Sequence, residues 1–320
     1  MKTNILYKLG IAALLAALLM LTGCKDSFLE VEPGKKMTLT EYFSTDEHIY
    51  EAVAATYHPM RLFDWNGATY NPINICSEVM TDNFWAGGAD LNDYTYWHYM
   101  EDFKADPLHT LDGIWKQCYL GVKNANDVLS YVETGKDKIT AEHQKLYTEE
   151  AMVLRAFYYC QLWKFYGYIP VYMKNLTSPY TCEQSAPDAA YDAIITSLEE
   201  AIAIGALPMQ WDDANLGRVN RATAYMLYAE MVMYQNDESR YSKALEYMRQ
   251  IINSGKFALH DNYAALWTKE GEWTKESIFE INYTDGPNGK RAYGGGVGNV
   301  GGTWLPRLIS PEGGVAADGV

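Results

Sequence analysis

Residues 149–170 read EEAMVLRAFYYCQLWKFYGYIP, and this stretch decides the fold class. Apolar side chains recur in it at steps of three and four residues, which places them on one face of a helix. The residues of this face are Ala151, Leu154, Tyr158, Leu162 and Phe165. Glu149 and Glu150 are expected near the start of the helix, where its dipole favours negative charge, and Gly167 is expected to end it. The stretch therefore predicts an amphipathic helix whose aromatic side chains pack in a core.

Helical periodicity also runs through much of the chain on either side of this stretch. The capping box Ser44-Thr45-Asp46-Glu47 is expected to open a helix that ends near Tyr57. Further helices are predicted over residues 111–132, 140–166, 187–204, 220–235 and 239–253. Residues 277–283 alternate between apolar and polar side chains and predict a short strand. Successive helical hairpins of this length favour a mainly α, solenoid-like scaffold.

Residues 60–107 form a long polar and aromatic region between two predicted helices. Long irregular stretches of this kind commonly carry function. Sugars present C–H faces that lie against aromatic rings and hydroxyls that need polar partners, so the region suits carbohydrate binding. The candidate ligand-binding residues are Asp82, Asn83, Trp85, Tyr94, Tyr96 and Trp97. The alternative for each tryptophan is a packing role in the scaffold, and Trp267, Trp273 and Trp304 are weaker candidates from later loops.

The first residues have the pattern of a secretory signal peptide. Lys2 and Lys8 precede an apolar run over residues 10–21, and this run is too short for a comfortable transmembrane helix. The sequence at 21–24, LTGC, resembles the lipobox of bacterial lipoproteins, in which the signal is cut before the cysteine and the cysteine carries acyl chains such as palmitate. We therefore expect a leader over residues 1–23, lipid on Cys24, and a tether over residues 24–40.

The central helix also carries a resemblance to a known family. The sequences LRAFYY at 154–159 and YGYIPV at 166–171 resemble the signature of the SusD/RagB family, surface lipoproteins of Bacteroides-type bacteria that bind nutrients. Supporting matches are scattered from residue 24 to about residue 284, including Ser77-Glu78 with Asp82-Asn83. The resemblance implies a tetratricopeptide-like helical-hairpin scaffold with long irregular loops and a few short strands, over residues 41–284.

The same resemblance implies a function and a location. The chain would be a non-catalytic glycan-binding lipoprotein on the outside of the outer membrane, taking up oligosaccharides or starch-like polysaccharides as nutrients. It would deliver them to a TonB-dependent, SusC-like transporter. SusD-like proteins typically continue well beyond the length of this chain. Residues 285–320 are Gly-rich and carry no recognisable terminal element, so the C-terminal part of the family is expected to be truncated here.

Composition excludes several other classes of function. The net charge of −15 argues against nucleic acid and anionic lipid headgroups as partners. The six histidines are scattered and no Cys-x-x-Cys pair is present, so no metal site is expected. A G-x-G-x-x-G match at 296–301 lacks a following helix, so no cofactor is expected. Cys118 and Cys160 fall in helical patterns and are expected to be buried, and any disulfide pairing stays open.

Three alternatives to glycan binding stay open at the level of the sequence. The same scaffold could bind another nutrient, such as a peptide, as some RagB-like members do. A surface glycosidase would need two carboxylates, and the pairs Glu78/Asp82 and Asp90/Asp93 are available. A pure assembly scaffold would bind no small ligand. Because no nucleophile or metal motif accompanies the carboxylates, the sequence predicts that the protein is not an enzyme.

Overall fold

The structure is a computed structural model, and it describes residues 37–61, 73–93 and 95–283. The chain divides into two units, Met1–Tyr42 and Phe43–Val320. In the first unit the described helix is α2 (Leu39–Tyr42), whose Glu41 carboxylate accepts the N–H of Thr38 at 2.8 Å. Among the described residues, no helix combines the length and the apolar character that a membrane crossing requires.

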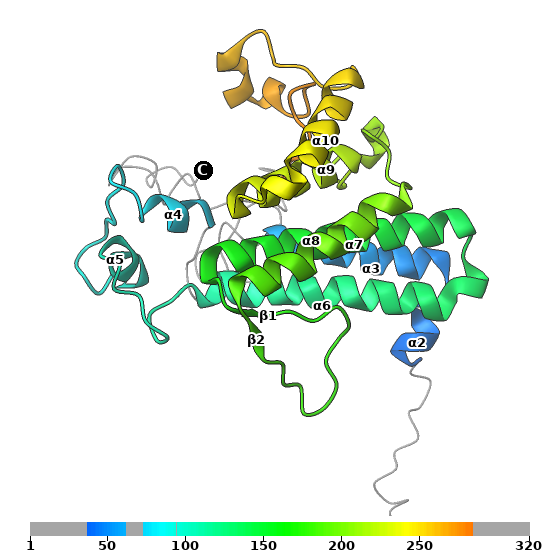
Figure 1. The fold of residues 1–320 in the computed structure, drawn as a ribbon, viewed down its shortest axis with the longest axis horizontal. Helices are drawn as coiled ribbons and strands as arrows, with labels where there is room; N and C mark the ends of the chain where they lie inside the picture. The colour runs from blue at the N-terminus through cyan, green and yellow to red at the C-terminus, as the bar shows by residue number, and fades with distance from the viewer. Residues whose placement is uncertain (1–36, 62–72, 94, 284–320) are drawn as a thin grey trace, which may run out of the picture. The chain divides into compact units, whose positions relative to one another are not determined.

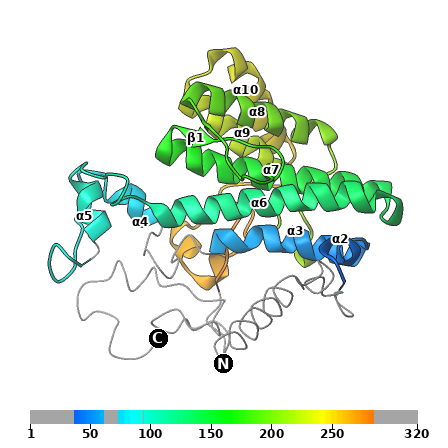
Figure 2. The ribbon, with the colours of Figure 1, turned by 90° about the horizontal axis from the view of Figure 1, so that it is seen from below.

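The second unit is built around a group of long helices that lie side by side (Figures 1 and 2). They are α3 (Asp46–Arg61), α6 (Asp112–Gly135), α7 (Ala141–Tyr166) and α8 (Pro187–Ile204). The hairpin of α9 (Arg221–Gln235) and α10 (Tyr241–Asn253) packs next to α8. Short 3₁₀ turns occupy Lys136–Lys138, Asp213–Asn215, Glu238–Arg240, Tyr263–Trp267 and Lys269–Gly271. The prediction of a mainly α scaffold of helical hairpins is confirmed.

The helix α7 is the centre of this unit, because it contacts α3, α6, α8 and α9. Its N-cap is Thr140, whose Oγ1 accepts the N–H of His143 at 3.1 Å, and Gly167 ends it at φ +68°, as predicted. Between Tyr147 and Trp163 every side chain except Thr148 and Phe157 is buried. The prediction of an amphipathic helix is therefore wrong: neighbouring helices cover α7 on all sides, so its apolar residues are not confined to one face.

The predicted positions of Glu149 and Glu150 are also wrong. The helix begins at Ala141, so both carboxylates lie beyond its first two turns and outside the reach of the N-terminal dipole. Both side chains are buried. A buried carboxylate needs hydrogen bonds or a cation, and each of these two has its own set of partners, described below.

Several predicted helices agree with the structure to within a few residues. α8 begins at Pro187 and is followed by Gly205 at φ +69°, where a left-handed conformation ends the helix. Asn220 caps α9 in a reciprocal pair with Thr223. In α3 the N-cap is Thr45 rather than Ser44, since the Thr45 hydroxyl accepts the N–H of His48 at 3.3 Å, and the helix continues past Tyr57 to Arg61.

The helices α6 and α7 approach closely where Gly121 faces Tyr158. A Cβ atom at position 121 would lie 2.3 Å from Cε2 of Tyr158. The Tyr158 side chain extends beyond Gly121, and its hydroxyl donates to the carbonyl oxygen of Thr56 at 2.6 Å. One side chain of α7 thus contacts both α6 and α3. The missing side chain at Gly121 is what gives that ring its space.

Two expectations about irregular regions are wrong. Residues 277–283 form no strand: the Ile278 carbonyl accepts from the Asn220 side chain at 2.9 Å, and the Glu280 carboxylate accepts the N–H of Trp273 at 3.0 Å. In the described ranges the one sheet pairs β1 (Ile169–Pro170) with β2 (Gln184–Ser185), antiparallel.

The second wrong expectation concerns residues 60–107, which were expected to be irregular. This stretch contains two short helices, α4 (Ile73–Glu78) and α5 (Thr95–Glu101).

The cysteines that the structure describes are all free. Cys118 and Cys160 are buried, as expected, and burial raises the pKa of the Cys160 thiol to about 12. Cys76 is buried in α4, and Cys182 is partly exposed. Buried thiols of this kind stay protonated and act as small apolar groups.

Candidate functional site

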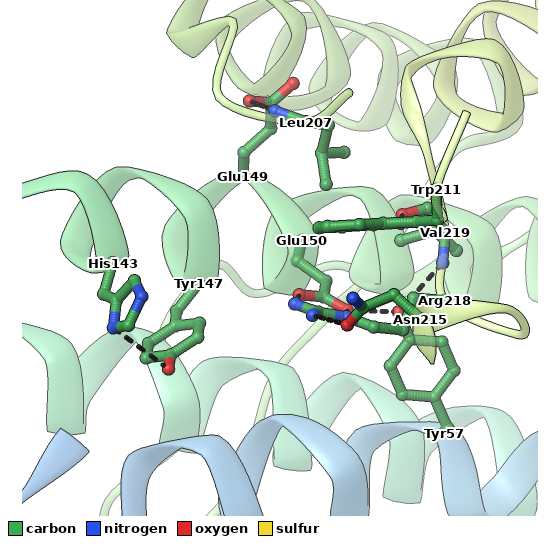
Figure 3. Close-up of polar contacts among 10 residues, drawn as sticks. All are labelled: Tyr57, His143, Tyr147, Glu149, Glu150, Leu207, Trp211, Asn215, Arg218 and Val219. Atoms are coloured by element: carbon green, nitrogen blue, oxygen red, sulfur yellow. Dashed lines mark hydrogen bonds and ion pairs between the residues drawn. The ribbon is translucent and has the colours of Figure 1, made fainter. Parts of the chain in front are cut away.

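The most deeply buried ion pair of the described residues joins Glu150 of α7 to Arg218. The Arg218 guanidinium donates to both carboxylate oxygens of Glu150, at 2.6 Å from Nη2 and 3.1 Å from Nε (Figure 3). The Tyr57 hydroxyl donates to the same carboxylate at 2.5 Å and accepts the N–H of Val219 at 3.0 Å. Both oxygens of Glu150 are thus occupied within the fold, so this carboxylate is not available for a ligand.

The neighbouring carboxylate, Glu149, points to the other side of the helix (Figure 3). One of its oxygens accepts the N–H groups of Ala206 and Leu207, the latter at 2.9 Å. Burial raises the pKa of Glu149, and the two backbone N–H groups oppose that shift. Together Glu149 and Glu150 hold residues 206–219 against α7. We therefore assign a structural role to this cluster.

An exposed tryptophan marks a pocket on the surface. The Trp85 side chain is 80% exposed, and it lies at a pocket of about 420 Å³ lined by residues 85–88, 90, 91, 98, 101 and 102. We call this the Trp85 pocket. An exposed indole offers an apolar face and an N–H donor, a combination that suits contact with a ligand or a partner. Asp90, His98 and Glu101 add polar groups beside the ring, so the pocket combines the two kinds of contact that a sugar needs.

The turn that carries Trp85 towards α5 is held by its own carboxylates. Asp93 accepts the N–H of Ala89 at 3.0 Å, and Asp90 accepts the N–H of Asn92 at 2.7 Å. Gly88, at φ +113°, lets the chain turn there. The carboxylates of the predicted pair Asp90/Asp93 thus stabilise a turn, and one of them also lines the pocket.

The helix α5 gives the pocket its second wall. His98 and Glu101 are one turn apart and line the Trp85 pocket, with Nδ1 of His98 3.9 Å from a Glu101 oxygen. Trp97 and Met100 are also one turn apart, and they are buried. The Trp97 side chain is 6% exposed, which favours the packing alternative for this tryptophan over a ligand contact.

The other predicted site residues lie away from the Trp85 pocket or outside the described residues. Asp82 and Asn83 are exposed but do not line the pocket. Tyr96 is partly buried, with its ring centroid 6.2 Å from that of His109. Tyr94, Cys24 and Trp304 lie outside the described residues. Of the later tryptophans, Trp267 is exposed and is far along the chain from the pocket residues.

Sequence reasoning did not select His98, Glu101 or Asp102 as site residues, and it named Asp90 only as half of the Asp90/Asp93 pair that a glycosidase would need. A signal was available for two of them, because a helical reading of residues 95–101 separates His98 and Glu101 from Trp97 and Met100. Treating the stretch as a loop hid that periodicity. Within the described ranges no three His, Cys, Asp or Glu side chains gather closely enough to hold a metal ion.

A larger groove is lined in part by other residues at the end of α5. Its volume is about 860 Å³, and residues of α4, α5, α7 and α9 line it. We call it the adjoining groove. Met100 and Phe103 line the groove, whereas Glu101 and Asp102, which lie between them in the sequence, line the Trp85 pocket. The end of α5 therefore contributes to the walls of both spaces. The groove is mainly apolar, with Tyr234 of α9 exposed in its lining.

Comparison with known proteins identifies relatives of this chain. A SusD-like family described as "Starch-binding associating with outer membrane" matches residues 27–233, more than half of the chain. SusD-like protein P25 of Formosa agariphila is 22% identical over 313 residues, which cover 90% of this chain and 55% of the relative.

Solved structures give a closer likeness. Surface glycan-binding protein A from Bacteroides uniformis is 47% identical with a TM-score of 0.72, over 75% of this chain and 53% of that one. Surface glycan-binding protein A from Bacteroides thetaiotaomicron, in complex with laminarihexaose, is 46% identical with a TM-score of 0.77, over 83% of this chain and 55% of that one. The chain thus spans little more than half the length of these relatives.

Proposed function

This chain belongs to the SusD-like family, and on that premise we propose that it is a non-catalytic glycan-binding protein of the outer-membrane surface. The observation that carries the proposal is the Trp85 ring, 80% exposed beside the carboxylates and imidazole of its pocket. A sugar ring lies with its C–H face on the indole, while its hydroxyls bond to Asp90, His98 and Glu101. These contacts hold a sugar without any bond being broken.

A β-glucan of the laminarin type is the substrate class that we propose. Support comes from the structure in complex with laminarihexaose, which is 46% identical to this chain over the aligned 55% of its own length. The acidic character of the chain agrees with a neutral glycan, because a net charge of −15 repels anionic polysaccharides. Laminarihexaose is therefore the probe for the experiments below.

We further propose that the protein acts at the membrane with a partner. Lipid on Cys24 anchors it to the outer membrane, where it passes the bound glycan to a TonB-dependent, SusC-like transporter. The lipobox-like sequence LTGC at 21–24 supports the anchor, and the family resemblance supports the partner. In this arrangement the Trp85 pocket captures the oligosaccharide and the transporter moves it inwards.

Calorimetric titration of the purified protein with laminarihexaose tests the glycan-binding role. Trp85→Ala is expected to weaken binding by roughly 1–3 kcal/mol, the usual cost of truncating an aromatic anchor, and to leave the melting temperature nearly unchanged because the ring is exposed. Trp267→Ala and Leu108→Ala are matched controls, since both side chains are exposed and neither lines the Trp85 pocket. The hexasaccharide should be recovered intact. Loss of affinity in Trp267→Ala but not in Trp85→Ala would move the site to the later loops.

A further inference from the structure

The helix α5 ends with an unusual residue at its C-terminal cap. The N–H of Lys104 bonds to the carbonyl of Tyr99 at 2.7 Å, and the N–H of Phe103 bonds to the carbonyl of Met100 at 3.0 Å. This pair of bonds is the Schellman motif, in which the capping residue adopts a left-handed conformation and is usually glycine. Here the capping residue is Phe103, at φ +54°. An aromatic residue is strained in this conformation because its Cβ crowds the backbone.

Packing does not explain the phenylalanine at this position. Its side chain is 78% exposed, so little apolar surface is removed from water to offset the backbone strain. Glycine or asparagine at position 103 would satisfy the cap at lower cost and would not expose an aromatic ring. Strained backbone conformations cluster at active sites and ligand clamps, so the strained and exposed Phe103 is a candidate for contact with a ligand.

The position of Phe103 indicates that its ligand is the same oligosaccharide that binds beside Trp85. Phe103 lines the adjoining groove, and the two residues before it, Glu101 and Asp102, line the Trp85 pocket. Successive Cα atoms are about 3.8 Å apart, so the end of α5 forms a narrow ridge between the two spaces. A linear oligosaccharide seated beside Trp85 and extended past this ridge enters the groove at Phe103. Polar side chains of the groove, such as Asn74 of α4, are available to its hydroxyls.

We propose that Phe103 is a second aromatic contact for the glycan and gives the protein its preference for long oligosaccharide chains. The inference rests on the proposed glycan-binding function and deepens it. A short oligosaccharide occupies the Trp85 pocket alone, whereas a long one also lies against the Phe103 ring in the adjoining groove.

Titration of one set of variants with two ligands, laminarihexaose and laminaritriose, tests this assignment. Phe103→Asn removes the ring but suits the left-handed cap, so it should not lower the melting temperature. It should weaken laminarihexaose binding about tenfold or more and leave laminaritriose binding within about twofold of the wild type. Phe103→Tyr keeps an aromatic face and should retain the affinity for laminarihexaose. Trp85→Ala should weaken the binding of both ligands.

The other possible results distinguish a failure of the role of Phe103 from a failure of the proposed glycan-binding function. If Trp85→Ala weakens both ligands while Phe103→Asn binds laminarihexaose as the wild type does, the role of Phe103 is overturned and the glycan-binding function stands. Equal losses for the two ligand lengths in Phe103→Asn, or equal losses in Phe103→Tyr and Phe103→Asn, also overturn it. If the wild type binds neither ligand, both the proposed function and the role of Phe103 are overturned.

Discussion

The Glu150 side chain is fully buried. Its carboxylate is bonded by the Arg218 guanidinium and the Tyr57 hydroxyl, and Arg218 in turn lies 4.2 Å from the centre of the Trp211 ring. A buried ion pair of this kind stabilises only as a complete set, because removal of one partner leaves an uncompensated charge. The set joins α7 to α3 and to residues 206–219, so its loss should affect the whole unit.

Glu150→Gln is therefore expected to lower the free energy of unfolding by about 3–5 kcal/mol, because Arg218 loses its counter-charge inside the fold. Glu246→Gln is the matched control. Glu246 pairs with Lys243 on the exposed surface of α10, where an ion pair contributes about 1 kcal/mol or less. Urea unfolding measures both. Similar losses in the two variants would contradict the importance of the buried pair.

Glu149 should make the free energy of unfolding depend on pH. Burial raises its pKa in the folded state above the ordinary value of 4.5, so the folded state holds this proton more tightly than the unfolded state does. The contribution of Glu149 to stability is therefore fully present below pH 4.5. It is lost as the pH rises through the pKa that Glu149 has in the folded state.

Glu149→Gln removes this titration and keeps an oxygen that accepts the N–H of Leu207. The unfolding free energy of the variant, relative to the wild type, should be higher at about pH 7 than at about pH 5. Comparing the two proteins at each pH cancels the titration of all the other groups that they share. A difference between variant and wild type that does not change with pH would show that the pKa of Glu149 is not raised.

At the scale of elements, the crossing of α6 and α7 depends on the absence of a side chain at Gly121. Gly121→Ala should improve the helix propensity of α6 but place a Cβ atom against the Tyr158 ring, so it should lower the free energy of unfolding by about 1–3 kcal/mol. Gly87→Ala is the control, because a Cβ atom there meets nothing within 4 Å. If thermal unfolding shows Gly121→Ala to be as stable as the control, the helices do not approach as closely as described.

Much of the fold was predictable because local signals mark the ends of its helices. Pro187 and Gly205 give the limits of α8, and Asn220 with Thr223 opens α9. Local signals do not reveal what surrounds an element, so the all-round burial of α7 was missed. The alternation over residues 277–283 suggested a strand, but a strand needs a neighbour, and the bonds of Ile278 and Glu280 go to a side chain and to a turn instead.

The site was predictable in region but not in detail. Trp85 and Trp97 have the same residue type and each follows an aromatic residue, yet one is exposed and the other is in the core. The difference arises because residues 95–101 form a helix whose inner face holds Trp97, while Trp85 follows a turn. The wall of the Trp85 pocket also needs residues 90 and 98–102 to come together, which depends on tertiary packing.

For the whole molecule, the lipid anchor that we propose at Cys24 would decide where the protein works. Metabolic labelling with an alkynyl fatty acid should mark the wild type and leave Cys24→Ser unlabelled, because the lipobox-like sequence places the acyl chains on that cysteine. Cys182→Ser is the control and should be labelled like the wild type, since Cys182 lies in the folded body. Equal labelling of the wild type and Cys24→Ser would refute the anchor.

A crystal structure of the protein with laminarihexaose tests the glycan-binding role most directly. We expect a glucose ring lying against the face of the Trp85 indole, with its hydroxyls bonded to Asp90, His98 or Glu101 and the chain continuing towards the adjoining groove. A complex in which the Trp85 ring stays in solvent, and the oligosaccharide lies elsewhere on the protein, would contradict it.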